Sequence, residues 1–162
     1  MSTQNANSGG LVNGSGTRVC IGQLDYSASA VSWTSTTVTY YFSVYIYCER
    51  YGYSTTSVLS TSLSCTGQTT RTTSGGDCDI NAGQRARLSP VPNSSPGYWA
   101  YSFPLTTSQY TRTINFSVTS TGSSVHGTSS GALTITIPAL SHHTVSYDAN
   151  GGTGTINQQT KY

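Results

Sequence analysis

The clearest pattern in the chain is the alternation of apolar and polar side chains along residues 37–48. One set of alternate positions is apolar: Val38, Tyr40, Phe42, Val44, Ile46 and Cys48. The other set carries hydroxyl groups: Thr39, Tyr41, Ser43, Tyr45 and Tyr47. A period of two over this length predicts a β-strand, with the first set facing a core and the second set facing water or a partner.

Three other segments alternate clearly, at residues 99–105, 110–118 and 133–137. Pro104 lies inside the first of them, and because proline cannot donate a hydrogen bond to a neighbouring strand, that segment is expected at a sheet edge or a strand end. All three segments therefore predict strands with one buried face.

Two weaker strands are expected at residues 18–26 and 58–65. The first changes parity near Gly22, as a β-bulge there would require. Six strands separated by Ser, Thr and Gly turns predict an all-β fold, an antiparallel immunoglobulin-like β-sandwich. Two sheets are expected because one sheet alone would leave its apolar face in water.

The same patterns divide the chain into three parts. Residues 1–16 are a Gly- and Ser-rich N-terminal arm with too few apolar groups to fold alone, so it is expected to be flexible or ordered by neighbours. Residues 17–140 form the sandwich, including a long irregular excursion over residues 77–97. Residues 141–162 form a linker and the start of a β unit, expected to be incomplete, with an Asn-Gly-Gly turn at 150–152 that supplies positive φ angles.

Charged residues make up 7% of the 162 residues, against roughly a quarter in an average soluble domain. Ser, Thr, Gly and Tyr take their place, which favours strands and turns over helices. The net charge is +2 and the seven basic residues are scattered, so no nucleic-acid partner is expected. The sequence shows no apolar run of about 18 residues and no secretory signal, so no membrane partner is expected.

The side chains that catalysis or metal binding requires are sparse. The five acidic residues are Asp25, Glu49, Asp77, Asp79 and Asp148. Only two of them are close in sequence, and they lack the further oxygen ligands of a calcium loop. The adjacent His142 and His143 would point to opposite sides of an extended segment, and no serine lies in a nucleophile elbow. We therefore expect no catalytic residue, no metal site and no cofactor, and hence no enzyme.

The four cysteines, Cys20, Cys48, Cys65 and Cys78, allow three pairings and lack the CxxC spacing of a zinc site. Cys65 and Cys78 flank a Gly-rich stretch, and a bridge between them would stabilise the fold by roughly 3 kcal/mol. Cys20 and Cys48 lie on predicted neighbouring strands. They could pair across the sheet or stay as buried thiols, and the sequence alone leaves both alternatives open.

Surface aromatic side chains are the best candidates for ligand binding. Tyr45, Tyr47, Tyr51 and Tyr53 lie on or just after the long strand, and Trp99 is expected behind them. Tyrosine gives a large contact area at a small entropic cost, so this surface would suit stacking on the rings of a glycan. The plainer alternative is that these residues decorate a strand or pack against another subunit.

Two parts of the sequence resemble known families. Residues 31–40 (VSWTSTTVTY), 113–118 (TINFSV) and 133–139 (LTITIPA) together resemble immunoglobulin-like modules in the tail proteins of siphophages. Residues 144–154 (TVSYDANGGTG), continuing to 159–162 (QTKY), resemble the opening of the Listeria-Bacteroides repeat, also called the internalin-type B repeat. In phage minor tail proteins this repeat often follows an immunoglobulin-like domain through a Pro-Ala joint, and Pro138-Ala139-Leu140 is similar to that joint.

The resemblance implies a structural component of a phage virion: a minor tail, fibre or capsid-decoration protein that assembles on the particle and aids attachment to the host surface. The implied partners are other virion proteins, further copies of the chain and a host cell-surface glycan. The implied location is the virion, after synthesis in the bacterial cytoplasm, where thiols are first kept reduced. The alternative is a glycan-binding or adhesin module on a bacterial cell surface, because B repeats also occur in bacterial surface proteins.

Overall fold

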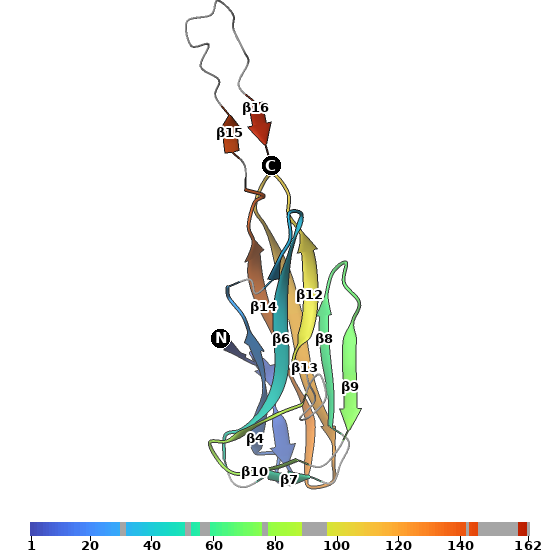
Figure 1. Cartoon of the computed structure of the whole chain (residues 1–162). Helices are drawn as coiled ribbons and strands as arrows, with labels where there is room; N and C mark the ends of the chain where they lie inside the picture. Colours follow the sequence, from blue (N-terminus) through green and yellow to red (C-terminus); the bar gives the residue numbers. More distant parts are fainter. Residues whose placement is uncertain are drawn as a thin grey trace, which may run out of the picture.

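The structure is a computed structural model that describes residues 1–29, 32–50, 53–55, 59–75, 78–88, 97–141, 143–145 and 159–161. Over these ranges every regular element is a β-strand, so the predicted all-β fold is confirmed. Figure 1 shows the strands arranged as an elongated body, with a smaller pair of strands beyond one end.

The strands follow one another closely along the chain. In order they are β1 (Ser2–Asn5), β2 (Ser8–Gly9), β3 (Leu11–Asn13), β4 (Arg18–Tyr26), β5 (Ser32–Trp33), β6 (Thr37–Cys48), β7 (Tyr53–Thr55), β8 (Leu59–Cys65), β9 (Arg71–Gly75), β10 (Cys78–Ile80), β11 (Arg85–Arg87), β12 (Trp99–Pro104), β13 (Tyr110–Thr121), β14 (Val125–Ile137), β15 (His143–Val145) and β16 (Gln159–Lys161). Twelve of them form one sheet. Eight of the twelve follow one another in the order β11-β6-β4-β3-β14-β13-β8-β9, and the other four pair with strands of this row: β1 with β4, β2 with β14, and β5 and β12 with β6.

Two halves of this sheet face each other across the core. Layer one consists of β4, β5, β6, β11 and β12, and layer two consists of β8, β9, β13 and β14. Side chains link the layers directly: the Tyr101 hydroxyl of β12 donates to Leu63 O of β8 at 2.8 Å, and the Tyr40 hydroxyl of β6 donates to Thr136 O of β14 at 3.1 Å. The sandwich is therefore built from two layers of a single curled sheet.

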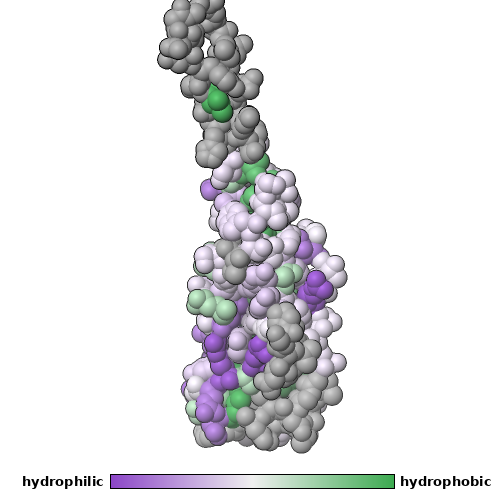
Figure 2. Space-filling view, in the orientation of Figure 1, coloured by the Kyte–Doolittle hydropathy of each residue, from purple (hydrophilic) through white to green (hydrophobic). Residues whose placement is uncertain are grey.

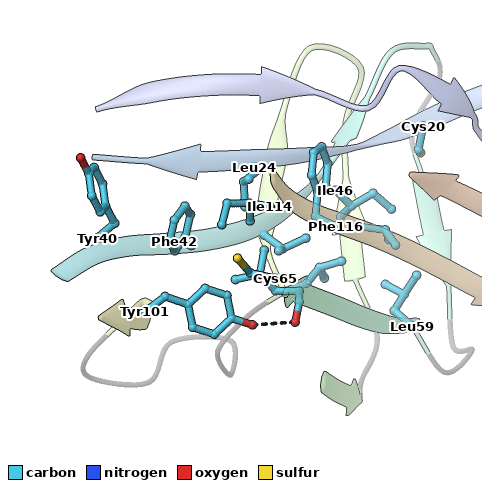
Figure 3. Close-up of a cluster of buried hydrophobic side chains, with 14 of the residues drawn as sticks. Cys20, Leu24, Tyr40, Phe42, Ile46, Leu59, Cys65, Tyr101, Ile114 and Phe116 are labelled. Atoms are coloured by element: carbon cyan, nitrogen blue, oxygen red, sulfur yellow. Dashed lines mark hydrogen bonds between the residues drawn. The ribbon is translucent and has the colours of Figure 1, made fainter. Parts of the chain in front are cut away.

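Apolar side chains from both layers fill the space between them (Figure 3). Phe42 and Ile46 of β6 and Leu24 of β4 point toward Ile114 and Phe116 of β13, and all five are at most 2% exposed. Burying one such side chain contributes about 1.5–3 kcal/mol. The core face predicted for residues 37–48 is confirmed, because every apolar position of that alternation is buried.

Strand β4 differs from the sequence expectation of a bulge at Gly22. Its register with β6 is continuous from the pair Cys20 and Cys48 to the pair Tyr26 and Phe42. The alternation is blurred because both faces of β4 are covered, so residues 19–25 are all buried. Gly22 has a packing role, since a Cβ there would lie 3.1 Å from Val118 Cγ2 in layer two.

The segment expected to be a flexible N-terminal arm is part of the sheet instead. Strand β1 pairs with β4, β2 pairs with β14, and β3 pairs with both β4 and β14. The segment therefore joins layer one to layer two, and Leu11 within it is 0% exposed. Its small polar residues could not build a core of their own, but their backbone groups complete the hydrogen bonding of β4, which follows them closely, and of β14, far away in the sequence.

The region expected to be an irregular excursion, residues 77–97, contains two short strands. Strand β10 pairs with β7, and β11 pairs with β6 by placing Arg85 opposite Tyr47 and Arg87 opposite Tyr45. Residues 89–96 of this region lie outside the described ranges.

The C-terminal segment forms a separate two-stranded sheet. Strand β15 pairs antiparallel with β16, with His143 opposite Lys161 and Val145 opposite Gln159. This pair lies beyond the end of β14 in Figure 1. The Asn-Gly-Gly turn expected at 150–152 lies outside the described residues.

The buried position of Leu11 gives a test of the N-terminal strands. Leu11→Ala should lower the free energy of unfolding by about 2–5 kcal/mol, because it removes a fully buried side chain and leaves a cavity. Val12→Ala is the matched control, since the neighbouring Val12 is only partly buried. Chemical denaturation measures both variants, and equal losses would contradict an ordered N-terminal segment.

Candidate binding surface

The outer face of β6 carries the most chemically varied surface of the described residues. Tyr41, Tyr45 and Tyr47 alternate with the core residues of this strand and are partly buried. Strand β11 adds Arg85 and Arg87 to the same face, because each lies opposite one of these tyrosines. Together with Tyr98, these five residues are called here the tyrosine–arginine face.

Arg85 is fixed at the centre of this face by two contacts. Its Nη1 donates to Asp25 Oδ1 of β4 at 2.8 Å, and its Cζ lies 4.2 Å from the centroid of the Tyr45 ring. Asp25, which is 3% exposed, also accepts a hydrogen bond of 2.6 Å from Thr3 Oγ1 of β1. Three strands therefore hold one guanidinium group against one aromatic ring.

The contacts around Arg85 also secure its charge. The hydrogen bond to Asp25 raises the pKa of Arg85, desolvation by burial lowers it, and the negative charge of Asp25 adds to the rise. Arginine is already protonated throughout the physiological range, so this group is a permanent cation. The surface thus presents a fixed positive charge beside tyrosine rings.

The far end of the face is closed by the chain that leads into β12. The Tyr98 ring lies 4.2 Å from the Tyr41 ring, centroid to centroid, and Tyr98 is 39% exposed. The Ser43 hydroxyl donates to Gly97 O. A Cβ at Gly97 would lie 1.5 Å from Arg87 Nη1, so a larger residue at this position would displace the end of the Arg87 side chain.

The predicted ligand-binding residues are only partly brought together. Tyr45 and Tyr47 lie on the tyrosine–arginine face as expected. Tyr51 lies outside the described residues, and Tyr53 is in β7 but its side chain is not among the described ones. Trp99 lies opposite Phe42 in the register of β12 and β6 and packs against the core. It therefore lies on the core side of layer one and does not belong to the tyrosine–arginine face.

The residues predicted from the sequence left out four members of this face, Tyr41, Arg85, Arg87 and Tyr98, and also Asp25, the partner of Arg85. The Arg85-Ala86-Arg87 triplet carries a usable signal, because a strand places its first and third residues on one face. Without knowledge that β11 pairs with β6, that signal does not connect the arginines to the tyrosines. The contact between Tyr41 and Tyr98 is invisible for the same reason.

The cysteines are placed as follows. Cys20 and Cys48 are direct register partners on β4 and β6, which confirms that they lie on neighbouring strands, and both are 0% exposed.

Cys65 is a buried thiol whose Sγ donates weakly to Thr66 O at 3.7 Å. Burial raises the pKa of Cys65, and the positive charge of Arg112 partly opposes that rise. This structure does not contain the bridge from Cys65 to Cys78, whose own side chain lies outside the described ones, and that pairing stays a prediction.

The outer face of layer two offers hydroxyl groups and no charge. In the register of β14, β13 and β8, Ser130 lies beside Ser117 and Ser117 beside Ser62. A hollow of about 420 Å³ lies over these strands, with Asn7 and Ser8 as one wall. Figure 2 shows the described surface mostly in the pale colours of intermediate hydropathy, with local patches of strong colour. This face offers hydrogen bonds to a partner but no electrostatic attraction.

The described ranges contain neither a metal-binding cluster nor a membrane-spanning helix. No group of three or more His, Cys, Asp or Glu side chains in these ranges could hold a metal ion. None of the described residues belongs to a helix long and apolar enough to cross a membrane.

Comparison with known proteins adds no assignment to this surface. No protein-family model, no curated protein and no solved structure matches the chain.

The ion pair beneath Tyr45 can be tested by Asp25→Asn. We expect this change to lower the free energy of unfolding by about 1–2 kcal/mol. The buried Asp25 carboxylate accepts two hydrogen bonds and would lose its negative charge, whereas water can still solvate the guanidinium group of Arg85. Glu49→Gln is the matched control, since it weakens the more exposed pair of Arg18 and Glu49 and should cost at most about 0.5 kcal/mol. Urea denaturation distinguishes the two, and an equal effect would contradict a structural role for Asp25.

Proposed function

We propose that the chain is a structural component of a bacteriophage virion, such as a minor tail, fibre or capsid-decoration protein, that assembles on the particle and projects its β-sandwich outward. The supporting sequence feature is the resemblance of residues 144–154 to the opening of a B repeat after an immunoglobulin-like module. The structural observation that supports the proposal is the position of the β15–β16 pair relative to the β-sandwich. The β15–β16 pair lies beyond the end of β14, as expected for modules placed one after another along a projecting rod.

Surface chemistry gives further support to a structural role. Only 7% of the residues are charged, and the hollow on the outer face of layer two is lined mainly by serine and asparagine side chains. Such a face gives up little solvation energy when a neighbouring subunit covers it, because its hydroxyl groups can exchange water for protein partners. The described residues are therefore better suited to packing and display than to reaction chemistry.

Quantitative mass spectrometry of purified particles tests this function. Particles should be separated by density gradient from the lysate in which the chain is produced. The chain should then appear in the particle fraction at a fixed ratio to the major capsid or tail-tube protein, since a structural component has a defined copy number. Detection of the chain only in the particle-free fraction would refute the virion role.

The alternative function is a glycan-binding or adhesin module of a bacterial surface protein. The tyrosine–arginine face favours it, because Tyr41, Tyr98 and Tyr45 offer rings for stacking beside the fixed cation of Arg85. Aromatic anchors of this kind often contribute most of the binding energy at a recognition surface. The same face would serve host attachment if the chain is a virion component.

A pair of matched tyrosine variants tests glycan binding. Tyr98→Ala should weaken binding to a glycan array or to purified cell wall by about thirtyfold, the effect of losing a hot spot of about 2 kcal/mol. Tyr110→Ala is the control, because it removes a tyrosine ring that packs against Arg112 on β13, away from this face. Equal weakening by both variants, or no binding by the wild-type protein, would count against a glycan site on the tyrosine–arginine face.

A further inference from the structure

Cys20 and Cys48 occupy positions that are suited to a covalent link. They are direct register partners on the antiparallel strands β4 and β6. Direct partners in an antiparallel pair project their side chains to the same face, and here that face is the core. Both side chains are 0% exposed, so the two sulfur atoms share one buried space at the ends of their strands.

The hydrogen bonds around this pair show which kind of register site it is. The Cys48 amide donates to Gln84 O at 2.9 Å, and Cys48 O accepts from the Gly83 amide at 2.9 Å. Both backbone groups of Cys48 therefore point away from β4. The Glu49 amide donates across to Val19 O at 2.8 Å, as the alternation of an antiparallel ladder requires. Cys20 and Cys48 thus form a non-hydrogen-bonded pair.

Non-hydrogen-bonded pairs bring opposing residues closest together. Their Cα atoms lie about 4.5 Å apart, against about 5.5 Å in hydrogen-bonded pairs. A disulfide needs a Cα separation of about 4.4–6.8 Å with the Cβ atoms turned toward each other. A non-hydrogen-bonded register position therefore falls within the Cα range that a disulfide requires.

The geometry points to a redox-controlled disulfide between Cys20 and Cys48, formed when the chain passes from a reducing to an oxidising environment. This inference stands on the sheet register and does not depend on the function proposed above. The inference links the two alternatives that the sequence left open: the cysteines are buried thiols before oxidation and form the bridge afterwards.

The reaction is thiol–disulfide exchange with a small disulfide such as oxidised glutathione. The thiolate of one cysteine attacks the S–S bond of the reagent and releases one glutathione thiol. The second cysteine then attacks the mixed disulfide and releases the other glutathione. Two cysteine thiols are oxidised, one glutathione disulfide is reduced, and the two protons end on the released thiols.

Local contacts set how easily the reagent reaches the pair. The Cys48 thiol donates to Arg50 O at 3.3 Å, and this hydrogen bond is lost on oxidation. Arg18 and Glu49 form a two-point ion pair beside the cysteines, with Nε to Oε2 at 2.7 Å and Nη2 to Oε1 at 2.9 Å. Because both cysteines are 0% exposed, they must be uncovered before a bulky oxidant can reach them, so oxidation should be slow in the native fold and faster near the unfolding transition.

Mass spectrometry and thermal unfolding of the full-length protein test the proposal. The reduced protein is incubated in glutathione redox buffers just below its unfolding temperature. We expect an intact mass lower by two hydrogen atoms, a proteolytic fragment that links Cys20 to Cys48, and a Tm higher by about 10 °C that dithiothreitol reverses. The rise follows because the bridge restricts the unfolded chain.

Three cysteine variants separate this bridge from other oxidation. Cys65→Ala should keep both the crosslink and the rise in Tm, whereas Cys20→Ala and Cys48→Ala should lose both. The proposal is overturned if alkylation shows that both thiols become accessible and yet no link between them forms. It is also overturned if the bridge involves Cys65, or if the linked protein unfolds at a lower temperature than the reduced protein.

Discussion

Strand β6 is the element on which the rest of the structure depends. It pairs with β4, β5, β11 and β12, more partners than any other strand in the described part of the chain. Its strict alternation gives it an inner face of buried apolar residues and an outer face of tyrosines. Since both faces belong to the same backbone, a shift in register by one residue would exchange core and surface at once. The packing of layer one on layer two therefore also fixes the geometry of the tyrosine–arginine face.

The strands that the sequence predicted well are those with one face exposed to solvent and the other face buried in the core. Strands β6, β12, β13 and β14 match the four clear alternations, and Pro104 ends β12 as its missing donor requires. The segment from β1 to β3 was missed because its residues are small and polar, and its order comes from partners remote in the sequence. Strand β4 was misinterpreted because it is covered on both sides, so burial does not alternate along it.

The same reasoning explains how far the site could be foreseen. The outward position of Tyr45 and Tyr47 could be predicted from the alternation along β6 alone. The positions of Arg85 and Arg87 could not, because they depend on the pairing of β11 with β6. Trp99 was placed on the wrong side even though its own alternation groups it with Tyr101 and Phe103, which are both buried in the core. The two cysteines could be assigned to adjacent strands from the sequence, but their hydrogen-bonding class depends on where the backbone of Cys48 points. The pattern along one strand thus predicts which of its residues share a face, whereas the contacts between strands can be seen only in the folded structure.

The pairing of β2 with β14 has a consequence for how the chain reaches this fold. Ser8 and Ser130 are hydrogen-bond partners although 122 positions separate them. During synthesis β2 emerges from the ribosome long before its partner β14 exists, so this side of the sheet cannot close until nearly the whole sandwich has been translated. Contacts of such high sequence separation slow folding and leave strand edges open in the meantime. A nascent chain of this kind should depend on chaperones or on low local concentration more than a helical protein of equal length.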